Sequence, residues 1–340
     1  MKHSSTFTLK IVLGLILIFL VGMIIYLLPI LQKKGGENIR IFIPYEATKN
    51  QIIDTLEVKL GEKYAKSVMR AWSLLGGSYL DAHGSYVVFP DTRAYQLARR
   101  LQNGRQTPVR FTFNNVRTLD QLASKASSEM EFTSQEFITA CDSVLIPMGF
   151  KSRAQYPAAF LPDTYDFYWT TTPMKFVERL ASYRNDFWSQ DRRDKAKQLG
   201  LTPVGVATIA SIVEEESSNI SERPVIARLY INRLKKGMKL QADPTVKFAV
   251  GDFSLRRITG QHLKKSSPYN TYLNLGLPPG PIRIPERLTL EQVLNAPENE
   301  YLYMCAKPDF SGTHNFAVDG AQHKKNAEAY HKALTARGIK

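Results

Sequence analysis

Three consecutive glutamates, Glu214, Glu215 and Glu216, follow the apolar segment PVGVATIASIV and are the residues best suited to acid–base chemistry. A helix turns about 100° per residue, so the three carboxyl groups would point in different directions. Glu216 falls in the middle of the apolar face, and Glu214 and Glu215 fall on the opposite side. The apolar face is formed by Val206, Ile209, Ile212 and Val213. We therefore expect Glu216 alone to meet apolar surroundings.

A carboxyl group in apolar surroundings has a raised pKa, because desolvation penalises its charged form. A carboxylic acid that stays protonated near neutral pH is what a general acid needs in order to protonate a glycosidic oxygen. The alternative is that the apolar face ends at Val213 and that Glu216 is a solvated residue of the last helical turn. Periodicity alone leaves both interpretations open.

Two polar segments further along the chain could bind a sugar. Gln241 and Asp243 lie in LQADPTV and could line a cleft, although Asp243 could equally cap the turn before Pro244. Tyr269, Asn270 and Tyr272 lie in PYNTY, which combines aromatic stacking surfaces with an amide that can hydrogen-bond an N-acetyl group. These five residues are the predicted substrate-binding residues.

Composition narrows the class of protein. The 340 residues are 44% hydrophobic with a net charge of +14, which fits a folded protein beside an anionic membrane or an anionic polymer. No nucleic-acid motif is present, so we expect no nucleic-acid partner. Cys141 and Cys305 allow one disulfide but no metal cluster, and the six histidines form no metal-binding pair with a carboxylate. We expect neither a metal nor a cofactor.

The uncharged run from Ile11 to Leu31 is long enough to cross a bilayer, which takes roughly 20 residues. A cleaved signal peptide would have a shorter apolar core and a small-residue cleavage site, whereas Gln32 and two lysines follow here. We predict a transmembrane helix over residues 11–31, with residues 1–10 as a cytoplasmic head. The rest of the chain would then lie outside the cytoplasmic membrane.

Two folded units are expected after this helix, both of the α+β class. Residues 38–107 combine the strand-like IRIFIP and GSYVVFP with helices that begin after Thr48 and Asp91, and this module is similar to a wall-binding LysM-like unit. Residues 108–340 form the larger domain. In it AAFLPDTYDFYWTT is interpreted as a structured loop, YLYMCAKPDFSGTHNFA as a β-hairpin and AQHKKNAEAYHKALTARG as a basic helix.

Several motifs, in order, resemble the YceG-like (MltG) endolytic murein transglycosylases. They are FLPDTYDFY, the segment from Ala210 to Gly251, SPYNTYLNLGLPPGPI and THNFAVD. The resemblance implies a single membrane anchor, a LysM-like module and a YceG-like catalytic domain that acts on peptidoglycan glycan strands near the membrane and its synthases. It also implies that Glu216 is the catalytic acid. Glu215 departs from the family pattern, which has a lysine at this position.

The predicted activity is endolytic cleavage of the bond between N-acetylmuramic acid and N-acetylglucosamine. Glu216 would act as general acid and then as base, leaving a 1,6-anhydro end. One alternative is a hydrolytic muramidase, which needs a second carboxylate within about 5–9.5 Å of the first, for which Asp163 and Asp243 are candidates. The other alternative is a membrane-anchored scaffold that binds peptidoglycan without cutting it.

Overall fold

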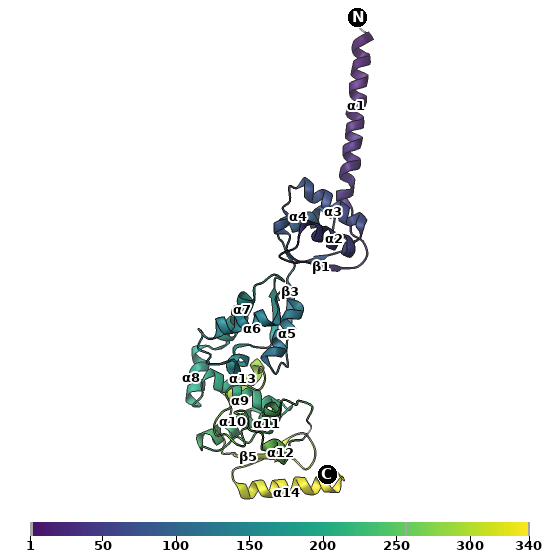
Figure 1. The fold of residues 1–340 in the computed structure, drawn as a ribbon. Helices are drawn as coiled ribbons and strands as arrows, with labels where there is room; N and C mark the ends of the chain where they lie inside the picture. Colours follow the sequence, from purple (N-terminus) through teal and green to yellow (C-terminus); the bar gives the residue numbers. More distant parts are fainter. Residues whose placement is uncertain (1–2, 256, 339–340) are drawn as a thin grey trace. The chain divides into compact units, whose positions relative to one another are not determined.

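The computed structural model describes residues 3–255 and 257–338 (Figure 1). Contacts divide the chain into two compact units. The first consists of Met1–Arg110, Glu129–Glu131 and Asp166–Thr171. The second consists of Phe111–Ser128, Phe132–Tyr165 and Thr172–Lys340. Helices and short strands occur in both, so the mixed α and β character that the sequence predicts is confirmed.

The first unit begins with a long apolar helix, α1 (His3–Leu27), which continues as the short 3-10 helix η1 (Leu28–Leu31). In the part of the chain that the structure describes, Leu9–Leu31 is the one helical segment that by itself is long and apolar enough to cross a membrane. None of its most apolar stretch is buried against the protein. The predicted apolar helix is therefore present, and its orientation in a membrane stays a prediction.

The remainder of the first unit packs three helices on a two-stranded antiparallel sheet. Its elements are β1 (Ile39–Ile43), α2 (Lys49–Leu60), α3 (Glu62–Leu74), η2 (Tyr79–Asp81), β2 (Gly84–Val88) and α4 (Ala94–Gln102). Ile39 pairs with Val88, and the register runs to Ile43 opposite Gly84. Thr48 caps α2 as predicted. The prediction for α4 was wrong, because Arg93 and not Asp91 precedes its first turn.

The second unit is mainly helical, with two short two-stranded sheets. Its elements, with the strand β3 that leads into it, are β3 (Val109–Phe113), α5 (Leu119–Glu129), α6 (Ser134–Leu145), η3 (Arg153–Ala159), β4 (Asp163–Phe167), α7 (Pro173–Phe187), α8 (Gln190–Gln198), α9 (Pro203–Glu216), α10 (Arg223–Lys235), α11 (Asp243–Val250), α12 (Gly260–Leu263), α13 (Arg287–Leu294), β5 (Tyr303–Ala306), β6 (His314–Ala317) and α14 (Gly320–Ala336). The predicted hairpin is β5 and β6, which pair antiparallel, and the predicted basic helix is α14.

The interpretation of FLPDTYDFY as a loop was wrong, because Asp163–Phe167 forms strand β4 and pairs with β3. Its side chains alternate, with Tyr165 and Phe167 buried and Asp163 and Asp166 exposed. This alternation is the signature of a half-buried strand, and the turn residues before it obscured the pattern.

Helix α9 lies at the centre of the second unit and packs against α10, α11 and α13. Thr202 caps its N-terminus by accepting a hydrogen bond from the Gly205 N–H, and Pro203 occupies the first helical position. Every residue from Gly205 to Glu214 is buried. A helix that is enclosed on all sides is a core helix, so its last residue is held by packing and not by local sequence alone.

Candidate active site

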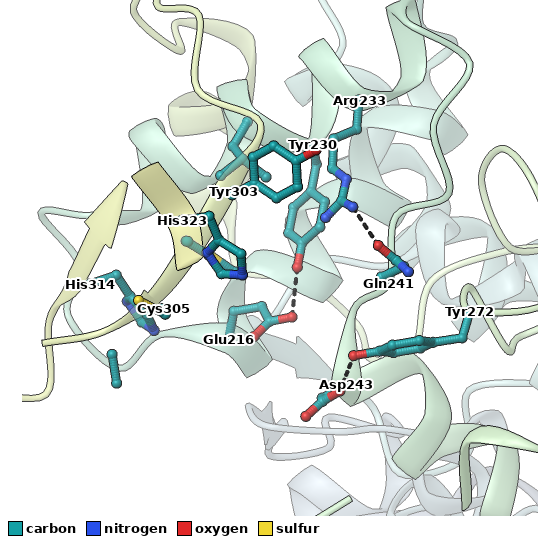
Figure 2. Close-up of a pocket in the computed structure, with 13 residues that line it drawn as sticks. Glu216, Tyr230, Arg233, Gln241, Asp243, Tyr272, Tyr303, Cys305, His314 and His323 are labelled. Carbon is teal, nitrogen blue, oxygen red and sulfur yellow. Dashed lines mark hydrogen bonds between the residues drawn. The ribbon is translucent and has the colours of Figure 1, made fainter. Parts of the chain in front are cut away.

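Glu216 is the last residue of α9 and lies in the wall of a pocket of about 470 Å³ (Figure 2). The helix ends there because Ser217 adopts an extended conformation, with φ −138° and ψ 127°. The other walls come from α10, the loop before α11, the β5–β6 hairpin and α14. The carboxyl group therefore has protein on most sides and an open face toward the pocket.

Tyr230, on α10, holds the carboxyl group of Glu216. Its hydroxyl donates a hydrogen bond of 2.6 Å to Oε1 of Glu216, which leaves the second carboxyl oxygen free of this contact (Figure 2). The tyrosine is only 2% exposed, so the bond is fixed by packing. Sequence reasoning missed Tyr230, and the available signal was that a buried tyrosine hydroxyl needs a polar partner.

The environment raises the pKa of Glu216 to about 7. Burial is the largest cause, because it removes water from the charged form, and the negative charge of Asp243 adds to it. The hydrogen bond from Tyr230 acts in the opposite direction, since it favours the carboxylate. A carboxyl group whose pKa lies near neutral pH can both donate a proton and accept one at that pH.

Asp243, at the start of α11, lies in the same pocket as Glu216 and is oriented by a second tyrosine. The hydroxyl of Tyr272 donates a hydrogen bond of 2.6 Å to Oδ1 of Asp243 (Figure 2). Glu216 and Asp243 also line a neighbouring pocket of about 280 Å³, with Lys247 among its other walls. Glu216 and Asp243 thus line both pockets.

Gln241 also lines the pocket, as predicted from the sequence, and its side chain accepts a hydrogen bond from an arginine. Nη2 of Arg233 donates a hydrogen bond of 2.6 Å to Oε1 of Gln241. Gln241 has a positive φ of 52°, a left-handed conformation that costs energy for a residue other than glycine and that recurs at functional sites. The guanidinium of Arg233 lies over the ring of Tyr303, 5.6 Å from its centroid.

Tyr269 and Asn270, the other two residues expected to bind substrate, do not line this pocket. Asn270 is fully buried: its amide nitrogen donates to the carbonyl oxygens of Leu263 and Lys265. Its side-chain oxygen accepts from the Tyr272 N–H at 3.0 Å. Tyr269 packs against Phe248, with ring centroids 4.6 Å apart. Both residues therefore shape the loop that presents Tyr272.

The prediction that only Glu216 of the three glutamates is shielded from solvent was wrong, because Glu214 is only 7% exposed. Its Oε2 lies 3.0 Å from Nε of Arg283, and its Oε1 accepts a hydrogen bond from the Glu286 N–H. Glu215 is paired with Arg283 at 2.9 Å and with Arg117 at 3.0 Å. The far side of α9 is thus an ion-pair network, whereas Glu216 lines a pocket and forms no ion pair with an arginine among the described residues.

The pocket is also lined by His314, His323 and Cys305. From the sequence, His314 was considered only as a weak candidate, and His323 and Cys305 were not candidate site residues. Nδ1 of His314 lies 3.1 Å from Oε2 of Glu222, and its backbone N–H donates to the same carboxylate. His323 stacks on Tyr303, with ring centroids 5.2 Å apart. Cys305 is unpaired, as is the buried Cys141, so the two cysteines form no disulfide.

The comparisons with known proteins agree on one family. A family model described as the YceG-like family matches residues 41–329. The endolytic murein transglycosylase of Bacillus subtilis (strain 168) is 26% identical over 320 residues, which cover 89% of this chain and 88% of that protein. The endolytic murein transglycosylase of Streptococcus pneumoniae serotype 2 is 29% identical over 180 residues, which cover 52% of this chain and only 32% of that longer protein.

A solved structure shows the same fold. The crystal structure of a yceG-like protein from Listeria monocytogenes superposes with a TM-score of 0.56 at 25% sequence identity. The superposition covers 85% of this chain and 98% of that one.

Proposed function

Because the chain belongs to the YceG-like family, we propose that it is a lytic transglycosylase that cuts peptidoglycan glycan strands internally. The observation that carries this proposal is the environment of Glu216, whose pKa is raised to about 7 in a pocket large enough for sugar rings. The curated relatives named endolytic murein transglycosylase support the class of reaction.

In the proposed mechanism Glu216 begins as the protonated acid. It gives its proton to the oxygen that bridges N-acetylmuramic acid and N-acetylglucosamine, and the bond from that oxygen to C1 of the muramic acid breaks. The resulting carboxylate then takes the proton of the muramoyl 6-hydroxyl, whose oxygen bonds to C1 and closes a 1,6-anhydro ring. No water is consumed, so one carboxyl group serves as both acid and base.

The neighbouring side chains have complementary proposed roles. Asp243 places a negative charge where the sugar ring becomes positive, and Tyr272 keeps that carboxylate oriented. Arg233 fixes Gln241, which would present its amide to an N-acetyl group. Tyr230 holds Glu216 in one position through both steps.

The proposed setting is the outer face of the cytoplasmic membrane. Residues 11–31 would anchor the chain with residues 1–10 inside, and residues 108–340 would form the catalytic domain outside. Residues 38–107 would act as a LysM-like module that holds the glycan strand. An anchored enzyme of this kind would cut new strands close to the synthases that make them.

A hydrolytic muramidase is the second candidate, because Asp243 lines the pocket beside Glu216 whereas Asp163 does not. Mass analysis of the strand ends released from purified peptidoglycan separates the two reactions. A lytic transglycosylase leaves ends that are lighter by one water than hydrolysed ends. Only reducing muramic acid ends would assign the chain to the muramidases, and intact strands would favour the scaffold.

A further inference from the structure

A second cavity, of about 410 Å³, lies at the N-terminal end of α9 and shares no residue with the pocket that contains Glu216. Three basic side chains line it, from Lys151, Arg184 and Arg193, and no acidic residue does. Apolar groups, including Leu277 and Pro278, form much of the remaining wall. The cavity is thus lined by both cationic and apolar side chains.

Five arginines are buried among the described residues: Arg184, Arg223, Arg228, Arg233 and Arg283. Three of them have a carboxylate partner: Arg223 with Glu286 at 3.6 Å, Arg228 with Glu298 at 2.7 Å and Arg283 with Glu214 at 3.0 Å. No ion pair within the described part of the chain involves Arg184 or Arg233. Both of these line a pocket, Arg233 beside Glu216 and Arg184 in the second cavity.

The guanidinium of Arg184 is held in place although no anion neutralises it. Nε donates to the Ala158 carbonyl at 3.2 Å, and the group lies 5.3 Å from the ring centroid of Phe150. Burial lowers the pKa of Arg184 to about 10, and the positive charge of Arg193 contributes. A buried cation without a counter-charge is costly, so an anion that entered the cavity would offset that cost.

Helix α9 adds to the positive potential. Thr202 to Gly205, at its N-terminal end, line the cavity, and the N-terminal end of a helix attracts negative charge. The dipole is secondary to the three cations. The lining by Met148, Leu277 and Pro279 suits a ligand that has a small apolar group beside its charge, which a bare inorganic phosphate does not have.

We propose that this cavity binds the carboxylate end of a short peptide. Arg184 and Arg193 form charge-assisted hydrogen bonds with the carboxylate, and the apolar wall takes the neighbouring side chain. Peptidoglycan stem peptides are the source of such a carboxylate, and this choice of source rests on the proposed function. The binding of a carboxylate in this cavity does not depend on the proposed function.

The test is a calorimetric titration of the full chain in detergent micelles with acetyl-D-alanyl-D-alanine and with its C-terminal amide. We expect the acid to bind at least about 10-fold more tightly than the amide, because the charge-assisted bonds are lost with the amide. Arg184→Met should weaken binding of the acid by about 10-fold to 100-fold. Lys197→Gln, an exposed change on α8 outside the cavity, is the matched control and should change nothing.

A second variant tests the same prediction if the Arg184→Met variant does not fold. Lys151 and Arg193 are exposed, and Nε of Arg193 donates one hydrogen bond to the Trp188 carbonyl oxygen, so the double change to glutamine should lower the melting temperature only slightly. It should weaken binding of the acid about 10-fold. Equal binding of acid and amide, or full binding by the folded double variant, overturns the proposal. Binding of inorganic phosphate without the peptide acid overturns the assignment to a carboxylate.

The titration also separates this proposal from the proposed function. Glu216→Gln should lose strand cleavage and keep full binding of the peptide acid, because Glu216 lies at the other end of α9. A parent chain that binds the acid and cuts no strands would refute the proposed function alone. A chain that cuts strands and ignores the acid would refute the second site alone.

Discussion

Replacement of Glu216 by glutamine should stabilise the folded chain at alkaline pH and leave its stability almost unchanged at acidic pH. The folded carboxyl has a pKa of about 7, whereas the ordinary value for a glutamate is 4.5. Because its folded pKa is raised, this group contributes stability that is fully present below about pH 4 and is lost as the pH rises through 7. Glutamine does not titrate, and its carbonyl oxygen can still accept the hydrogen bond from Tyr230.

The size of the effect follows from the difference in pKa. A difference of about 2.5 units, at about 1.36 kcal/mol per unit, gives about 3 kcal/mol in the free energy of unfolding at pH 9. This is an upper limit, because the pocket side of the carboxyl is open to water. In a unit of this size about 1 kcal/mol moves the melting temperature by about 2–4 °C. The variant should therefore melt at most about 6–12 °C above the parent chain at pH 9.

Differential scanning calorimetry of the full chain in detergent at pH 5, 7 and 9 measures this difference. Glu178→Gln is the matched control, because Glu178 is exposed on α7. At each pH this variant should melt at nearly the same temperature as the parent chain. A gap between the Glu216→Gln variant and the parent that is the same at pH 5 and pH 9 would refute the reasoning, since the buried carboxyl would then be charged throughout.

Tyr230→Phe removes a hydrogen bond that favours the charged form of Glu216, so the alkaline limb of the activity–pH profile, expected near pH 7, should move to higher pH. Asp243→Asn removes a negative charge and should move the same limb to lower pH; movement of both variants in one direction would contradict the electrostatic account. Glu215→Lys should lower the free energy of unfolding by about 3 kcal/mol in a denaturant titration, because Arg117 and Arg283 each lose a carboxylate partner. An unchanged transition would mean that these ion pairs contribute nothing. A reporter that works only in the cytoplasm should be silent when fused to the C-terminal end of the chain, and an active reporter would reverse the proposed orientation.

Local features of the chain could be predicted from sequence because their causes are local. The apolar run that forms α1 and the hairpin of β5 and β6 depend on neighbouring residues only. The separation of Glu216 from Glu214 and Glu215 also followed from helical geometry. The start of α4 was misplaced because an aspartate that suits a cap lies three residues before the helix, in a turn.

Contacts between residues that are distant in sequence could not be predicted in this way. Periodicity shows the direction of Glu214 but not the arginine that it contacts, Arg283, which lies in the loop before α13. The burial of Asn270 depends on carbonyl groups of the preceding loop, which no motif reveals. Tyr230 was missed for the same reason, because its partner becomes visible only when α9 and α10 pack together.

Glu216 is proposed as the acid that cleaves the glycan strand. The most direct measurement is the turnover of purified strands by Glu216→Gln and Glu215→Gln, each normalised to the folded fraction found by thermal melting. We expect the Glu216 variant to lose activity by about 10²-fold to 10⁴-fold and the Glu215 variant to keep most of it. Full activity in the Glu216 variant, with loss in the Glu215 variant, would contradict the account.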